Sequence, residues 1–266
     1  MHYEIRPMSL GEILDMGFRV LRDHFSVLVG LAATIYVPLL LFGSAIELII
    51  PQGSVTSPDD VRNGLPLLLG AAAAGALWTI VAWPVASAAI THAVGELYLG
   101  RSATLAQSLR TGWSLVVPLS GTTLLMVLYV LGGLLLFIVP GIYLGLSYAL
   151  VWPVMVLERR FGAAALRRSR ELMKGNLLRI AGLVTVAGLL TTVLSSAVQF
   201  GLGYIPGVGS LASALVQSVG TAFGTAFTVL LYFDVRCRKE AFDVEHLARL
   251  VEQQAVSPSS APAPIA

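Results

Sequence analysis

Long apolar runs alternate with short amphipathic stretches along the whole of this chain. A helix that crosses a bilayer needs about 20 apolar residues and must satisfy its backbone hydrogen bonds internally. Six runs meet that requirement, at residues 25–50, 65–97, 113–139, 141–157, 177–200 and 210–233. The pattern therefore predicts an all-α fold, a polytopic membrane bundle of six transmembrane helices with cytoplasmic amphipathic interfacial helices.

Prolines and glycines mark where these helices should bend or end. Pro140 and Gly141 separate the third run from the fourth, and this pair predicts a tight hairpin turn. Pro84, Pro118 and Pro153 lie inside runs. They predict kinks, because proline lacks the amide hydrogen that a helix interior uses.

The first polar stretch, residues 9–24, has the periodicity of an amphipathic helix. Ser9 and Glu12 have the spacing of a capping box, in which each side chain bonds the backbone amide of the other residue. Apolar positions recur on one helical face: Leu10, Ile13, Leu14, Phe18 and Leu21. We expect this face to dock against the bilayer or the helix bundle.

Comparable short helices are predicted at residues 103–110, 162–174 and 243–252, each lying flat at the inner leaflet. The chain then divides into an amphipathic helix (1–24), a six-helix transmembrane domain (25–234), a cytoplasmic C-terminal helix (235–254) and a disordered tail (255–266). Three of the short helices each precede a pair of apolar runs, as a helix-plus-hairpin unit repeated three times would. Amphipathic helices also recur for generic reasons, so a true repeat and convergent patterning both stay open.

Composition agrees with a membrane protein, and the positions of the charges indicate its orientation. Hydrophobic residues make up 56% of the 266 and charged residues 12%, against about 25% charged in soluble domains. Of the 17 lysines and arginines, all but Arg62 fall on the side of the N-terminus when six spans are drawn. Because basic residues are retained in the cytoplasm, we expect a multi-pass protein of the plasma membrane with both termini cytoplasmic.

Two further counts narrow the class of protein. A net charge of +2 is too small for a nucleic-acid-binding surface. The single cysteine, Cys237, cannot form an intramolecular disulfide. The expected partners are therefore membrane lipids, together with other membrane or cytoplasmic proteins, and no nucleic acid.

Ionisable residues inside predicted spans are candidates for function, because burying them in a bilayer is costly. Glu47 lies near the outer end of the first span, where it is either solvated or part of a solute pathway. His92 and Glu96 share a helix face, which allows a hydrogen-bonded polar pair or half of a metal site. Since no third histidine or carboxylate stands at a compatible spacing, we expect the polar pair.

Basic residues cluster after the fourth run: Arg159, Arg160, Arg167, Arg168, Arg170 and Lys174. Such clusters attract anionic lipid, so these side chains are candidates for binding phosphate-bearing headgroups. The positive-inside rule explains the same cluster without specific binding.

Motifs of catalysis are missing from the sequence. It contains no glycine-rich phosphate loop, nucleophile elbow, zinc-binding helix or paired-carboxylate signature. No catalytic residue, metal ligand or cofactor site is therefore expected.

Five segments carry a resemblance to a known family. They are residues 6–25 (RPMSLGEILDMGFRVLRDHF), 140–144 (PGIYL), 153–158 (PVMVLE), 165–175 (ALRRSRELMKG) and 231–243 (LYFDVRCRKEAFD). These segments look like the bacterial family called the glycerophosphoryl diester phosphodiesterase membrane domain, and the resemblance implies a bacterial cytoplasmic membrane. Some members join this part to a soluble phosphodiesterase barrel of about 250 residues. The stretch after Phe233 is too short for such a barrel, so the activity is not implied.

Three functional hypotheses follow. The sequence favours a non-catalytic integral membrane protein that organises or regulates partners or lipids at the inner leaflet. The alternative is a transporter or lipid-translocating protein for a small or lipid-linked solute, which a substrate cavity would support. An enzyme acting on lipid headgroups is the third.

Overall fold

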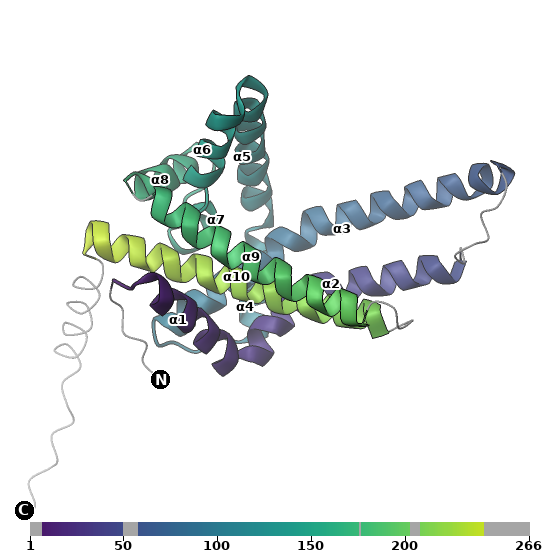
Figure 1. The fold of residues 1–266 in the computed structure, drawn as a ribbon, viewed down its shortest axis with the longest axis horizontal. Coiled ribbons are helices and arrows are strands. Elements are labelled where there is room, and N and C mark those ends of the chain that lie inside the picture. Colours follow the sequence, from purple (N-terminus) through teal and green to yellow (C-terminus); the bar gives the residue numbers. More distant parts are fainter. Residues whose placement is uncertain (1–6, 50–57, 176, 203–207, 242–266) are drawn as a thin grey trace, which may run out of the picture.

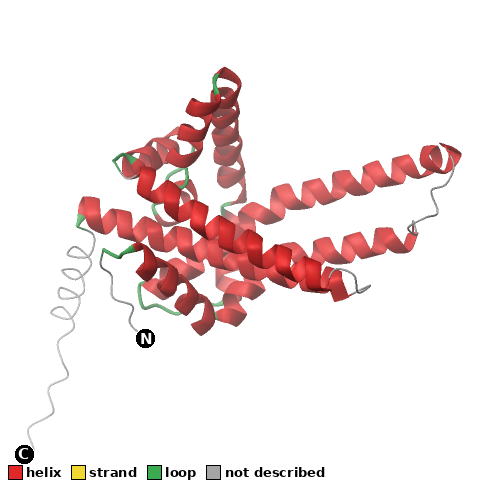
Figure 2. Cartoon of the chain, viewed as in Figure 1, coloured by secondary structure: helices red, strands yellow, loops and turns green. Residues whose placement is uncertain are grey.

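All regular structure in the described part of the protein is helical (Figure 2). The computed structural model describes residues 7–49, 58–175, 177–202 and 208–241. The helix predicted at 243–252 and the tail predicted at 255–266 lie outside these residues.

The helices fall into three successive units, each a short helix followed by a hairpin of apolar helices. The first unit contains α1 (Leu10–Asp23), α2 (Phe25–Ile49) and α3 (Pro58–Tyr98). The second contains α4 (Leu105–Ser114), α5 (Val116–Leu136), α6 (Ile138–Ser147) and α7 (Val151–Leu157). The third contains α8 (Ala163–Met173), α9 (Leu177–Leu202) and α10 (Val208–Glu240). Figure 1 shows the α5–α6 hairpin projecting in a different direction from the α2–α3 hairpin.

Four segments of the described residues are long and apolar enough to cross a membrane: Phe25–Phe42, Val116–Leu136, Ile138–Leu157 and Ala214–Glu240. Much of their surface contacts no other part of the protein, and Leu135 near the tip of the α5–α6 hairpin is 88% exposed. Apolar surface of this extent is unfavourable in water. The helices therefore indicate a membrane protein.

The turn between α5 and α6 lies at Phe137, and the prediction of a turn at Pro140 and Gly141 is wrong. Phe137 has an extended backbone (φ −158°, ψ 147°). Pro140 falls in the first turn of α6, where helical amides have no intrahelical acceptor and proline is tolerated. Gly141 lets the hairpin close, because a Cβ there would lie 2.7 Å from the amide nitrogen of Leu134.

Two more boundaries differ from the prediction. Trp113 belongs to the short helix α4, and the fourth apolar run is interrupted at residues 148–150. Pro118 and Pro153 are each the third residue of a new helix, so they follow breaks and do not kink a continuous helix. Pro84 does lie inside a helix, as predicted.

The short helices pack in a cyclic order. α4 packs on α3, α8 packs on α7, and α1 packs on α10. The short helices of the second and third units thus each lie on the last helix of the unit before them in the chain. The short helix of the first unit lies on the last helix of the third, which closes the circle. The three last helices, α3, α7 and α10, also contact one another, and the main apolar core surrounds their junction.

Helix α1 shows how the sequence produces this packing. The predicted capping box is present, because the Ser9 amide donates to Glu12 Oε2 at 2.6 Å and Ser9 Oγ accepts from the Glu12 amide. Ile13 is fully buried, and the ring of Phe18 lies 4.5 Å from that of Phe223 on α10. The apolar face of α1 therefore docks against α10, although Phe18 at its edge remains 50% exposed.

Helix α4 approaches α3 more closely than most residues would allow. Thr104 caps α4 by accepting from the Gln107 amide at 3.3 Å. One turn from its end, Gly112 faces the α3 backbone, where a Cβ would overlap the carbonyl oxygen of Val85. Glycine is therefore required at position 112 for this contact.

Candidate functional site

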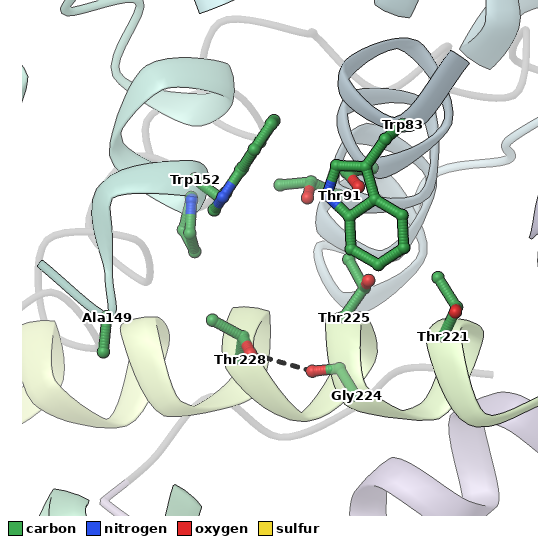
Figure 3. A pocket seen from close by; sticks show the side chains of 10 residues that line it. Trp83, Thr91, Ala149, Trp152, Thr221, Gly224, Thr225 and Thr228 are labelled. Atoms are coloured by element: carbon green, nitrogen blue, oxygen red, sulfur yellow. Dashed lines mark hydrogen bonds between the residues drawn. The ribbon is translucent and has the colours of Figure 1, made fainter. Parts of the chain in front are cut away.

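A cavity of about 230 Å³ lies where the last helices of the three units meet. We call it the central cavity. Its walls are formed by α3, by α7 with the turn before it, and by α10 (Figure 3). None of the residues that line it carries a charge.

Hydroxyl groups supply most of the polarity of this cavity. Two of them already have partners: Thr228 Oγ1 donates to the Gly224 carbonyl at 2.8 Å, and Thr221 Oγ1 lies 2.7 Å from the Tyr36 hydroxyl. Bonding to the carbonyl four residues back is a common way for threonine to satisfy itself within a helix. The cavity is lined by five hydroxyl side chains: Ser87, Thr91, Thr221, Thr225 and Thr228.

Among the five hydroxyls of the cavity, that of Thr91 is buried without a partner in the described part of the protein. Its side chain is 0% exposed, and Oγ1 has no hydrogen-bond partner in the described part of the protein. Leaving a buried hydroxyl unsatisfied costs about 1–3 kcal/mol. Less than 1 Å² of Oγ1 is exposed, so a polar ligand in the cavity would remove that cost after a small rotation of the Thr91 side chain.

Two tryptophans form opposite sides of the cavity. Figure 3 shows Trp83 of α3 and Trp152 of α7 on either side of the space, with Thr91 between them. Each tryptophan is followed by a proline, Pro84 or Pro153. Helix α7 begins directly after the break at 148–150, and Trp152 and Pro153 stand in its first turn. The break therefore sets where Trp152 meets the cavity.

Gly224 keeps the cavity open on the α10 side. A Cβ built at this position meets no atom within 4 Å. Its absence therefore leaves empty space, and glycine here serves a purpose other than close helix contact.

A second cluster of polar groups joins α7, α8 and α10 outside the cavity. Arg168 of α8 lies between two carboxylates, 2.9 Å from Glu158 and 2.6 Å from Glu240. The Tyr232 hydroxyl donates to Glu158 at 3.0 Å, and Arg236 pairs with Glu240 at 2.9 Å. The bonds to Glu240 and Glu158 raise the pKa of the Arg168 guanidinium above its ordinary value, so its charge is permanent.

The end of α10 also binds the segment before α1 and the end of α8. Asp234, 0% exposed, accepts from the Met8 amide at 2.8 Å, and Arg238 donates to the Met8 carbonyl at 2.7 Å. Lys239 Nζ donates to the carbonyls of Glu171 and Lys174 at the C-terminal end of α8. The bonds to Met8 join the first unit to the third and so complete the cyclic order, while those of Lys239 hold α8 and α10 together within the third unit.

Four residues of the predicted basic cluster have partners within the described part of the protein. Arg168 is bound as described, Arg160 lies 3.3 Å from Glu158, and Arg170 donates to the Tyr148 hydroxyl at 2.7 Å. Arg167 lies 3.9 Å from Glu171. Arg159 and Lys174 are exposed. Five of the six, all but Arg168, are nevertheless exposed, and their binding of lipid headgroups stays a prediction.

In the described part of the protein, His92 and Glu96 are not hydrogen-bonded to each other. The carboxylate of Glu96 pairs with Arg101 at 3.3 Å, while Nδ1 of His92 is buried without a hydrogen-bond partner. No three His, Cys, Asp or Glu among the described residues are placed to hold a metal ion. Glu47 lies in α2, but its side chain is outside the described part.

Sequence reasoning missed the residues of the central cavity. Two signals were available: the Trp-Pro pair, which occurs at both 83–84 and 152–153, and the recurrence of threonine on one face of α10 at 221, 225 and 228. Neither signal says that the two patterns face each other, because residues 83 and 152 meet only through the packing of α3 on α7.

Comparisons with known proteins leave the family unassigned: the chain matches no protein-family model, and neither a curated protein nor a solved structure is similar to it. The resemblance to the glycerophosphoryl diester phosphodiesterase membrane domain stays a prediction.

Proposed function

We propose that the chain is a six-span protein of a bacterial cytoplasmic membrane, with both termini and helices α1, α4 and α8 on the cytoplasmic side. The four apolar segments support this, and α3 and α9, with 41 and 26 residues, are long enough to supply the other two spans. The distribution of lysine and arginine supports the orientation.

Within that topology, the protein binds a small uncharged polar solute, or the uncharged polar group of a lipid, and carries it through the membrane. The observation that carries this proposal is the central cavity, whose lining combines hydroxyls, two tryptophans and no charge. Binding sites at the junction of repeated units are typical of transporters. The breaks at residues 115 and 148–150 and the proline within α3 are the irregularities that a moving bundle uses.

A second candidate is a non-catalytic module that organises partners or lipids at the inner leaflet. The observation that favours it is the contact region of α8, the end of α10 and the segment before α1, which we call the base and place on the cytoplasmic side. Bonds from α10 hold α8 and the segment before α1 in fixed positions there. A rigid base of this kind also suits a scaffold for other proteins. The two candidates differ in whether the central cavity takes a ligand.

The topology is tested by labelling single cysteines in a Cys237→Ser background. Cysteines at Thr104, directly before α4, and at Ala163, the first residue of α8, should react only after the membrane is opened, because both positions lie on the predicted cytoplasmic side. A cysteine at Asn63 should react in intact cells. Labelling of the Ala163 position from outside intact cells would contradict the six-span arrangement.

The cavity is tested by thermal-shift and tryptophan-fluorescence screens of uncharged sugars, polyols and amides with the purified protein. Thr91→Val keeps the side-chain shape and removes the unpartnered hydroxyl. We expect it to weaken binding of a stabilising compound roughly five- to tenfold, since one hydrogen bond contributes about 1 kcal/mol and 1.4 kcal/mol is tenfold.

Thr123→Val is the matched control, because Thr123 Oγ1 is also buried without a partner but lies on α5 outside the cavity. Both variants should be at least as stable as the parent, and only Thr91→Val should bind less tightly. Equal affinity in the two variants, or no stabilising compound in any class, would leave the scaffold as the better candidate.

A further inference from the structure

An apolar groove of about 570 Å³ lies between α2, α3 and the short helix α4. It is separate from the central cavity, because α3 presents Val81, Ala82 and Val85 to the groove and other residues to the cavity. Its volume falls within the range of roughly 300–1,000 Å³ that is usual for ligand sites. The groove is therefore large enough for one flexible apolar chain.

One cationic side chain, Arg110 of α4, stands in the lining of this groove. Within the described part of the protein it has no ion pair or hydrogen bond, whereas Arg101, Arg160, Arg168 and Arg170 are bound to Glu96, Glu158, Glu240 or Tyr148. A guanidinium prefers a phosphate or carboxylate in a two-point contact. The protein supplies neither group to Arg110, and this exposed guanidinium is free to bind an anionic group from outside the protein.

Two tryptophans accompany the arginine. Trp113, next to the groove on α4, is 65% exposed, and Trp78 on α3 donates from Nε1 to the Ile35 carbonyl at 3.2 Å. Tryptophan concentrates at the level of lipid headgroups, where its ring is apolar and its N–H remains hydrated. Helix α4 thus presents an aromatic ring and a free cation at one end of an apolar groove.

We infer that this groove binds one anionic phospholipid of the inner leaflet, with an acyl chain between α2 and α3 and the phosphate at Arg110. The inference rests on the proposed membrane topology but not on a ligand in the central cavity. It places the lipid-binding site at Arg110, which lines an apolar groove, and not at the basic cluster at 159–174, where Arg160, Arg167 and Arg168 pair with carboxylates.

The test compares phosphatidylglycerol with phosphatidylcholine, using the full chain in nanodiscs that contain both lipids. Native mass spectrometry of the ejected protein should find phosphatidylglycerol retained in preference, and Arg110→Gln should lower that preference roughly five- to tenfold. Brominated phosphatidylglycerol should quench tryptophan fluorescence, and Trp113→Phe should remove part of the quenched signal.

Arg19→Gln is the matched control, because Arg19 is an exposed arginine on the corresponding short helix α1 and lines no part of the groove. General attraction of lipid to a basic surface would be weakened equally by both substitutions. Arg110 is itself exposed, so its replacement should leave the melting temperature unchanged. Equal loss of preference in the two variants, or a parent that retains both lipids equally, would overturn the inference. A groove occupied by a second copy of the chain would appear as a dimer and would overturn it as well.

Discussion

Replacing Arg168 with methionine should destabilise the protein more than any other substitution of an arginine on α8. The side chains of Arg168 and Glu158 are only 15% and 11% exposed, and Arg168 is the cation that Glu158 and Glu240 share. Removing one partner of a buried ion pair leaves an uncompensated charge and costs about 3–5 kcal/mol. Because Arg160 and Arg236 still lie near the two carboxylates, we expect about 3 kcal/mol, measured as a lower melting temperature in detergent.

The neighbouring residue provides the control for this prediction. Arg167 lies on the same helix, but its side chain is 78% exposed and it is 3.9 Å from Glu171. Arg167→Met should change stability by less than about 1 kcal/mol, as is usual for exposed pairs. The double variant Arg168→Met with Glu158→Met should be more stable than Arg168→Met alone, since it removes the buried carboxylate that has lost its shorter ion pair. If Arg168→Met and Arg167→Met had the same melting temperature, the ion pairs of Arg168 would not contribute to the stability of the protein.

Replacing Gly224 with leucine should abolish binding in the central cavity without unfolding the protein. No atom lies within 4 Å of a Cβ at this position, so the new side chain would fill a large part of the 230 Å³ space. Leucine also has a higher helix propensity than glycine by about 0.5–1 kcal/mol. We therefore expect an unchanged or higher melting temperature, with affinity for any cavity ligand reduced at least about a hundredfold, or about 2.8 kcal/mol.

Gly188→Leu controls for the change in helix propensity. Gly188 is exposed on α9, and a Cβ there also meets nothing within 4 Å. It should raise stability to a similar degree and leave binding unaltered. A readout that needs no ligand is available too, because Trp83 and Trp152 should become less accessible to acrylamide in Gly224→Leu alone. Ligand affinity equal to that of the parent in Gly224→Leu would show that the cavity is not the binding site.

The short helices α1, α4 and α8 could largely be predicted from the sequence, because the sequence patterns that specify them are local. The capping box needs only Ser9 and Glu12, three residues apart, and a helix places them together whatever surrounds it. The short helices α4 and α8 likewise follow from the positions of polar and apolar residues within a few turns. Boundaries at prolines were less certain, since Pro140 can end one helix or begin the next, and the packing of Gly141 on Leu134 decides between these outcomes.

The sites were less predictable because they join residues far apart in the chain. His92 and Glu96 are neighbours on one helix, yet Glu96 turns to Arg101 beyond the helix end, where its charge is better satisfied. Arg168 is separated by 72 residues from Glu240, and periodicity within α8 cannot show that α10 ends beside it.

The sequence by itself determined that the chain is a helical membrane protein. Hydrophobicity within each run decides whether that segment enters the bilayer, and periodicity within the run decides its secondary structure. Tertiary structure decided which polar groups are neutralised and which are left free. Packing of α3, α7 and α10 brings Trp83, Trp152 and Thr91 around one space. The packing of α8 places Arg168 beside Glu158, whereas that of α4 places Arg110 at a groove that offers it no carboxylate. Whether a charge or hydroxyl finds a partner depends on distances between helices, and these distances are set only when the three units close on one another.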